Sequence, residues 1–512
     1  MNFDIVIRNG MIVDGTGQPA YAGDVGIVDD KIAAIGDLEG AAAETVIDAA
    51  GRIVAPGFID VHVHSELALL GGRDRYAPLK MGVTTQLAGP DGFSWAPLAG
   101  VSFQEMKELL HVFYEDDALN GYNAMTVQQL LDLYRGHIPS NLVLQAPHGS
   151  IRCAVVGWED RPATEDELQA MEKLTSEWME AGAKAFCTGL EYEPMRRADT
   201  RELVRLAKVA GRYGGLYVAH QRGYADKVAI GCGETFRIAR EAEVPVHISH
   251  FAVSETAEQL VDGALREGLR VTFDMYPYPA GCTHLLMGLP EDLQLGPPVD
   301  IIRRLQDRSV RESMKEYIEQ YFPLDRVVFA AAGADQPTGW EGLSLGEVRD
   351  LLGMPLQDAV AHILIKTNLQ ALMVYHWPKE RYGELQRTFR HRTHMVSTDG
   401  VYVGEKPHPR GFGTYPKVLG EYVRENGWLT LEEAVYKMSG FPAKTFGIRN
   451  RGIVSKGCYA DLVVFDPHTI AGPATFADPR QDPVGIDYVL VNGRIAIDHN
   501  QPCAGLHGRV LD

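Results

Sequence analysis

Short apolar runs alternate with helical stretches through most of the 512-residue chain. Runs such as GVTTQLA, residues 82–88, are apolar, rich in β-branched residues and bounded by glycine or polar residues, which is typical of buried strands. Segments such as residues 163–183 have apolar residues at helical spacing and an acidic first turn. This alternation predicts an α/β fold, a parallel (β/α)8 TIM barrel. Its eight strands are expected at residues 53–62, 82–88, 141–147, 183–190, 215–220, 244–250, 270–276 and 393–399.

The two ends of the chain follow a different pattern, with short apolar runs separated by Asn-Gly, Asp-Gly and other glycine-rich turns. Such turns are typical of β-hairpins. Because an isolated hairpin is marginally stable in water, we expect both ends to build one small β-sandwich domain. That domain would comprise residues 1–55 and 452–512, and the barrel would span residues 56–451.

Two stretches of the barrel region, about residues 101–138 and 285–385, are longer than an ordinary connection between a strand and a helix. We expect them to be helical insertions over the mouth of the barrel, where long loops are commonly functional. The sequence leaves open whether they close as a lid or form the contact of a homo-oligomer.

Charge and cysteine content narrow the class of partner. The formal net charge is -19, and basic residues form no block, which argues against nucleic acid or an anionic membrane as the main partner. The six cysteines are scattered without a CxxC pair and fit a reducing compartment. The N-terminal sequence MNFDIVIRNG lacks the pattern of a secretory signal, so we expect a cytoplasmic protein acting on a small molecule.

Candidate metal ligands collect where the predicted strands end, and in a (β/α)8 barrel the active site lies at the carboxyl ends of the strands. His62 and His64 lie two residues apart on the first strand, so both imidazoles can face one divalent ion. An HxH pair alone is more often structural. The other strand ends supply Asp91, Glu191, His220, His250 and Asp399.

Longer motifs carry a family resemblance. The HVH of residues 62–64, the THMVSTDG that contains Asp399, and GIVSKGCYADLVVFDP resemble the amidohydrolase superfamily of metal-dependent hydrolases. More closely, the segments GVTTQLAGPDGFSWAPL, AHQRG, VPVHISH, YPYPAGCT and HPRGFGTYPKVLGEYVRE resemble the N-acyl-D-amino-acid deacylase, or D-aminoacylase, branch. The resemblance covers nearly the whole chain.

The resemblance implies a reaction and a set of roles. His62, His64, His220 and His250 match metal ligands, and Asp399 matches the residue that accepts a proton from water and passes it to the departing amine. Zn²⁺ suits such ligands, as one or two ions, with another divalent metal as an alternative. The implied activity is hydrolysis of a linear amide, an N-acyl-D-amino acid or a close analogue.

The chain departs from the branch at two positions. Where the branch has a zinc-binding cysteine this chain has Asp91, whose carboxylate can also bind or bridge zinc. Glu191 is the second candidate bridge, and the sequence does not separate the two. Lys184 begins its strand, so it is not expected to reach the site. Where the branch has a lysine that can meet the substrate carboxylate, this chain has Ala252.

Five residues are candidates for binding the substrate. A guanidinium can bind a carboxylate through two parallel hydrogen bonds, so an arginine could replace the missing lysine. Tyr192 is expected to donate a hydrogen bond to the substrate or to the developing oxyanion, and His148 lies in a turn that the resemblance places near the site. The arginine candidates are Arg152, Arg222 and Arg410.

Two other functions are alternatives. A hydrolase of cyclic amides or imides, similar to hydantoinase and dihydropyrimidinase, would use the same barrel and metal chemistry, although the fourth strand lacks a lysine at its mouth. A non-catalytic scaffold related to these enzymes should have lost its ligands. This chain keeps them.

Overall fold

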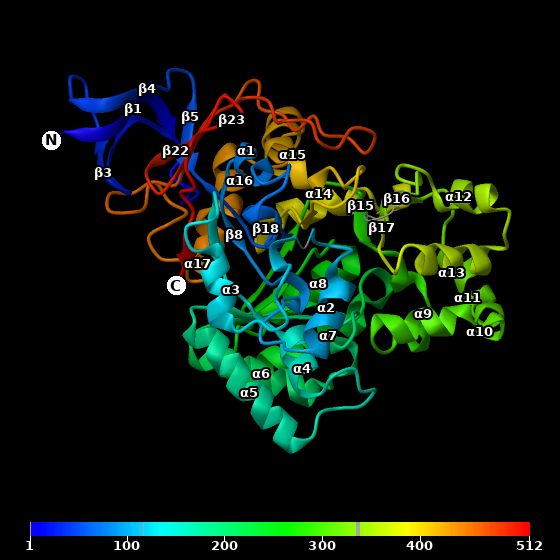
Figure 1. The fold of residues 1–512 in the computed structure, drawn as a ribbon. Coiled ribbons are helices and arrows are strands. Elements are labelled where there is room, and N and C mark those ends of the chain that lie inside the picture. The colour runs from blue at the N-terminus through cyan, green and yellow to red at the C-terminus, as the bar shows by residue number, and fades with distance from the viewer. Residues whose placement is uncertain (1, 116, 334–337) are drawn as a thin grey trace.

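A computed structural model describes residues 2–115, 117–333 and 338–512 (Figure 1). Parallel strands form the centre of the larger part of the chain, and each strand that the pattern predicted is present among the described residues. One set pairs in the order β6, β8 and β9, and a second set pairs in the order β10, β11, β12, β13, β14 and β18. The bounds are β6 Phe58–Asp60, β8 Val83–Leu87, β9 Asn141–Val143, β10 Ala146–Pro147, β11 Ala185–Gly189, β12 Leu216–His220, β13 Val246–Ile248, β14 Val271–Met275 and β18 His394–Val396.

The last strand of the series meets the first and closes the ring. Beyond β18, strand β19 (Gly400–Val401) pairs in parallel with β7 (Val63–His64), which continues β6. The backbone N–H of Asp399 donates to the carbonyl of His62 at 2.8 Å. Because β9 and β10 are separated by two residues only, they are successive parts of one strand. The described residues therefore contain a closed ring of eight parallel strand positions.

Helices connect consecutive strands and cover the outside of the ring (Figure 1). Helix α5 (Glu165–Glu180) begins with a capping box, in which the Thr164 hydroxyl accepts from the N–H of Glu167 and the Glu167 carboxylate accepts from the N–H of Thr164. Helix α6 (Thr200–Arg212) begins at Asp199, which caps the N–H of Glu202. The other connecting helices include α4 His148–Val155, α7 Val228–Ala242, α8 Glu255–Arg266, α14 Gly383–Arg390 and α16 Leu431–Met438.

Strands from the two ends of the chain form one sheet beside the ring (Figure 1). Strand β5 pairs in parallel with β1 and antiparallel with β20, so Val54 lies opposite Val464 across a separation of more than 400 positions. The pairing of the two ends agrees with the repeated hairpin pattern. Within the described residues the nine strands are β1 Phe3–Ile12, β2 Tyr21–Val28, β3 Lys31–Gly36, β4 Ala43–Asp48, β5 Ile53–Pro56, β20 Leu462–Phe465, β21 Ile486–Val491, β22 Arg494–Asp498 and β23 Gln501–Pro502.

The two predicted insertions differ in structure. The stretch 101–138 contains α2 (Val101–Leu110) and α3 (Val127–Tyr134), as expected. The stretch 285–385 contains helices, but it also contains two strands, so the expectation of a purely helical insertion was wrong. The runs VVFAAA and ALMVYH pair antiparallel as β16 (Val327–Ala332) and β17 (Ala371–His376), and β17 also pairs with β15 (Ala280–His284). The helices are α9 Pro298–Gln306, α10 Arg308–Ser313, α11 Lys315–Tyr321, α12 Leu345–Leu352 and α13 Leu356–Lys366.

In the parts of the chain that the structure describes, no helix combines the length and the apolar character that crossing a membrane requires.

Candidate metal centre

Two histidines and two aspartates from different strand ends face one another at one end of the ring. The Nε2 atom of His62 lies 3.7 Å from Oδ1 of Asp91 and 3.5 Å from Oδ1 of Asp399. The Nε2 atom of His64 lies 3.6 Å from Oδ2 of Asp91 and 3.5 Å from the same oxygen of Asp399. These separations exceed a direct hydrogen bond, so the four side chains converge on a shared space rather than on each other.

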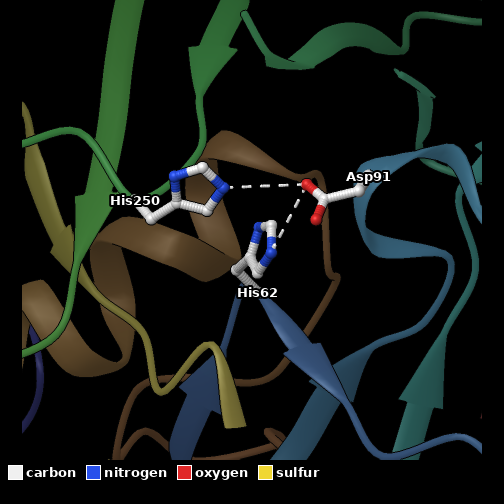
Figure 2. A group of neighbouring side chains, drawn as sticks. All are labelled: His62, Asp91 and His250. Carbon is white, nitrogen blue, oxygen red and sulfur yellow. Dashed lines mark ion pairs between the residues drawn. The ribbon is translucent and has the colours of Figure 1, made fainter. Parts of the chain in front are cut away.

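Two further imidazoles also approach Asp91. Its Oδ1 atom lies 3.7 Å from Nδ1 of His220 and 3.8 Å from Nε2 of His250. Figure 2 shows His62 and His250 both pointing toward this carboxylate. Asp91 is therefore shared by the imidazole pair of the first strand and the pair supplied by the fifth and sixth strands.

Three of these residues have an unusual backbone conformation. The φ angles of Asp91, His250 and Asp399 are 53°, 39° and 47°, in the left-handed region that residues other than glycine rarely adopt. Asp274 stabilises one of these turns, since its carboxylate accepts the backbone N–H of His250 at 3.0 Å and the Ser397 hydroxyl at 2.5 Å. Backbone strain of this kind concentrates at functional sites.

The electrostatics of the cluster favour a bound cation. Burial lowers the pKa of His62 to about 4, so its imidazole is neutral and can offer a lone pair. Burial by itself raises the pKa of Asp91, but His62, His250 and His220 outweigh burial and hold that pKa below its usual range. Burial lowers the pKa of His250, yet the nearby carboxylates of Asp91 and Asp399 raise it to about 9. Positive charge is therefore stabilised beside these carboxylates.

The donor atoms fit a metal ion. Nε2 of His62 and Oδ1 of Asp91 are buried atoms without a hydrogen-bond partner, which costs free energy unless a ligand satisfies them. Within the described residues, two overlapping groups place all their donor atoms within 4.8 Å: His62 with Asp91 and His250, and His62 with His64 and Asp399. Neutral imidazoles with carboxylate oxygens suit Zn²⁺.

Glu191 was a candidate bridge, but the structure places it outside both groups. Its Oε2 atom lies 3.0 Å from Nε2 of His220, the ring nitrogen that faces away from Asp91. The carboxylate that approaches all four imidazoles belongs to Asp91. Glu191 instead orients His220, because a bond to one ring nitrogen fixes the role of the other.

Two of the predicted substrate-binding residues are buried in a separate ion-pair network. Nε2 of His148 lies 2.7 Å from Oε1 of Glu202, and the Arg152 guanidinium pairs with the other oxygen of Glu202. Arg152 also donates to the carbonyls of Pro194 at 3.0 Å and Arg161 at 2.6 Å. Since both side chains are fully buried and satisfied within the protein, the expectation that they bind substrate was wrong.

The other two arginines differ from each other. Arg222 donates to Glu234 at 3.1 Å and to the carbonyls of Arg196 and Ala198 at 2.7 and 3.0 Å, so its guanidinium is also committed to the protein, against expectation. Arg410 reaches the cluster, with Nη1 2.7 Å from Oδ2 of Asp399.

Arg410 is buried, stacks over Tyr276 at 4.4 Å, and leaves Nε and Nη2 without a hydrogen-bond partner. Its charge is the main reason that the pKa of Asp399 is low. Burial alone raises that pKa, but Arg410, His64 and His62 lower it below 3.8. Asp399 is therefore ionised at neutral pH.

An aromatic pocket lies beside the metal-binding groups. The ring of Tyr192 packs 4.8 Å from that of His220, and Phe113 stacks on His64 with centroids 5.5 Å apart. The hydroxyl of Tyr192 lies 3.3 Å from that of Thr283. The pocket is lined by Phe93, Leu109, Leu110, Phe113, Trp158, Tyr192, Glu193, His284, Leu286, Gln294, Gly296 and Ile301. Phe113 and His284 were missed by sequence reasoning, because neither lies at the end of a barrel strand.

Comparison with known proteins agrees with this geometry. The model of the amidohydrolase family matches residues 45–497, and the chain belongs to that family. A D-aminoacylase of Alcaligenes xylosoxydans xylosoxydans is 35% identical, over 99% of this chain and 97% of the relative. An N-acyl-D-glutamate deacylase from the same organism is 32% identical, over 99% and 96%. The crystal structure of N-acyl-D-glutamate deacylase from Bordetella bronchiseptica, complexed with zinc and a phosphonate inhibitor that mimics the tetrahedral intermediate, is 31% identical, with a TM-score of 0.83 and complete coverage of both chains.

Proposed function

We propose that the protein is a metal-dependent hydrolase of a linear amide C–N bond, which removes the acyl group from an N-acyl-D-amino acid or a close analogue. The observation that carries this proposal is the buried cluster in which Asp91 and Asp399 face the imidazoles, and in which Nε2 of His62 and Oδ1 of Asp91 lack a hydrogen-bond partner. The whole-length similarity to D-aminoacylase supports the same reaction.

The first-strand histidines, Asp91, His220 and His250 would hold zinc, with its Lewis acidity available to polarise the amide carbonyl and to acidify a water molecule. Asp399 is ionised and its Oδ1 faces both His62 and His64. It accepts the proton as water adds to the carbonyl carbon, and returns that proton to nitrogen as the C–N bond breaks. The products are a carboxylic acid and a free amine.

Arg410 has two roles in this mechanism. Its Nη1 holds the Asp399 carboxylate and keeps it charged. Its remaining buried donors can bind the carboxylate of the substrate, which compensates for the absence of a lysine at position 252. Tyr192 stands beside His220, where its hydroxyl can donate to the substrate.

The aromatic pocket favours a substrate with an uncharged side chain. Its one ionisable acid, Glu193, is paired with Arg197, and the other lining residues are aromatic, aliphatic or uncharged polar. An acidic side chain would be buried there without a cation among these lining residues, which is costly. We therefore expect N-acetyl-D-leucine or N-acetyl-D-phenylalanine to be hydrolysed faster than N-acetyl-D-glutamate.

We also propose the domain division from the sequence: a β-sandwich of residues 1–55 and 452–512, and a barrel of residues 56–451. The pairing of β5 with β20 supports the discontinuous domain. The cytoplasmic location and the homo-oligomeric state stay predictions.

The test is amine release by zinc-reconstituted protein from matched N-acetyl-D- and N-acetyl-L-amino acids, with bound metal quantified on the same sample. We expect release from the D series and at least one bound zinc. A zinc-loaded protein that hydrolyses dihydrouracil or hydantoin, and no acylated amino acid, would contradict the linear-amide proposal in favour of a cyclic one.

A further inference from the structure

Two consecutive residues of the 101–138 insertion hold the imidazole of His64. Phe113 stacks on its face, with centroids 5.5 Å apart and planes inclined by 20°. The hydroxyl of Tyr114 lies 3.1 Å from Nδ1. All three side chains are buried. The insertion therefore fixes both the plane and the rotation of a ring that belongs to the first barrel strand.

The hydrogen bond to Tyr114 also selects a tautomer. Nε2 of His64 faces the shared space, 3.6 Å from Asp91 and 3.5 Å from Asp399. For Nε2 to offer its lone pair to a cation, the ring proton must be on Nδ1. That N–H then donates to the oxygen of Tyr114, which leaves the hydroxyl proton of Tyr114 for another acceptor.

The acceptor within reach of Tyr114 is the carboxylate of Glu66. This residue is buried and lies two positions after His64. Its Oε2 atom has no hydrogen-bond partner, and its carboxylate is close enough that, together with burial, its charge raises the pKa of the Tyr114 hydroxyl. Its Oε1 atom accepts the backbone N–H of Gly89 at 2.7 Å. Gly89 has a φ of 79° and lies two residues before Asp91. Glu66 therefore lies beside Tyr114, which holds the candidate ligand His64. It also holds Gly89, which belongs to the turn that carries the candidate ligand Asp91.

We propose that Tyr114 and Glu66 are positioning residues of the metal centre. The chain of contacts His64 Nδ1 to Tyr114 to Glu66 holds His64 in the tautomer that presents Nε2, and Glu66 also anchors the turn that presents Asp91. This inference rests on the proposed function, because it assumes that the cluster binds zinc. Partners of this kind typically change metal affinity by roughly 10- to 100-fold.

A packing role alone would make a different prediction. Tyr114 also contacts Trp95 edge-to-face, with centroids 5.0 Å apart, and phenylalanine would preserve that contact. The substitution Tyr114→Phe therefore removes the hydroxyl and leaves the ring. Tyr278→Phe is a matched control, since Tyr278 is buried and its hydroxyl has no hydrogen-bond partner.

The experiment measures zinc affinity directly, by equilibrating zinc-loaded protein with chelator-buffered free Zn²⁺. We expect Tyr114→Phe to lose zinc at a free concentration about 10-fold or more above that of the wild type. The control should lose zinc where the wild type does. Glu66→Gln should weaken zinc binding at least as much as Tyr114→Phe does. The double variant should bind zinc no more weakly than Glu66→Gln alone, because Tyr114 acts through the same chain of contacts.

The melting temperatures of the zinc-loaded variants test whether each one folds, and Tyr114→Phe decides the question alone if Glu66→Gln does not fold. Equal zinc affinity in the wild type and Tyr114→Phe overturns the positioning role and leaves the hydrolase proposal intact. If Tyr114→Phe binds zinc more weakly, the positioning role is supported. If, in addition, the wild type releases no amine from the acylated amino acids, the proposed substrate is overturned while the positioning role stands.

Discussion

The two carboxylate oxygens of Asp399 face different partners: one faces the guanidinium of Arg410, and the other faces the imidazoles of His62 and His64. Oδ2 lies 2.7 Å from Nη1 of Arg410, and Oδ1 lies 3.5 Å from Nε2 of both His62 and His64. One oxygen is therefore held in place while the other faces the space where water and substrate would meet. This arrangement gives Asp399 a defined orientation and a defined charge.

Replacement of Asp399 by asparagine tests its role in proton transfer. Asparagine has nearly the same shape and tolerates the left-handed conformation at this position, so the fold should be retained. We expect kcat to fall by roughly 10²- to 10⁴-fold, because the amide cannot accept the proton. The measurement is kcat for N-acetyl-D-leucine, with zinc content and melting temperature as controls. Full activity in Asp399→Asn would eliminate Asp399 as the proton acceptor.

The charge of Arg410 should set the acid limit of activity. Arg410 lowers the pKa of Asp399, and the reaction needs the ionised carboxylate. In Arg410→Met that pKa rises, so the acid limb of the kcat profile moves to higher pH and activity is lost earlier as the pH falls. Arg410→Lys keeps a positive charge and should keep the limb closer to its original position.

The pH profile of kcat, rather than of kcat/KM, reports groups in the substrate complex and so separates this effect from weaker substrate binding. Coincident acid limbs in the wild type and Arg410→Met would show that Arg410 does not control Asp399.

Asp91 and Glu191 should differ in their effect on metal content. Asp91 contacts all four imidazoles, whereas the Glu191 carboxylate contacts only His220 among them. We expect Asp91→Asn to reduce the bound zinc per chain or its affinity by at least about tenfold, and Glu191→Gln to have a smaller effect. Metal analysis after dialysis against chelator-buffered zinc measures both. The reverse order would make Glu191 the bridging carboxylate.

Arg152 should be needed for stability rather than for substrate binding. Its guanidinium and Glu202 form a fully buried ion pair, and removal of one partner from such a pair costs about 3–5 kcal/mol. Arg152→Met should therefore lower the melting temperature clearly while the KM of the folded fraction changes little. A large rise in KM at unchanged stability would restore Arg152 as a substrate anchor.

The sequence predicted the positions of the strands and the residues at their ends, because both follow from local patterns. His62, His64, His220, His250 and Asp399 come together since parallel strands bring their carboxyl ends to one side. The antiparallel strands of the second insertion were not separated from the helices around them, because short apolar runs fit either structure.

The roles of the arginines could not be predicted in the same way. Whether a guanidinium is free depends on acceptors that lie far along the chain, such as Glu202, which is 50 positions from Arg152. Tyr114 carries no motif, and its proximity to His64 follows only from the path of the insertion. Local patterns contain neither kind of information.

The pairing of β7 with β19 has a consequence for how the protein acquires activity. The proton acceptor and the first imidazole pair come together only when segments more than 330 residues apart pair, as Val63 does with Gly400. Contacts of such long range form slowly, because the intervening chain must be ordered first. During refolding, helical content should therefore recover before hydrolytic activity does, and the appearance of activity should mark the moment at which the ring closes.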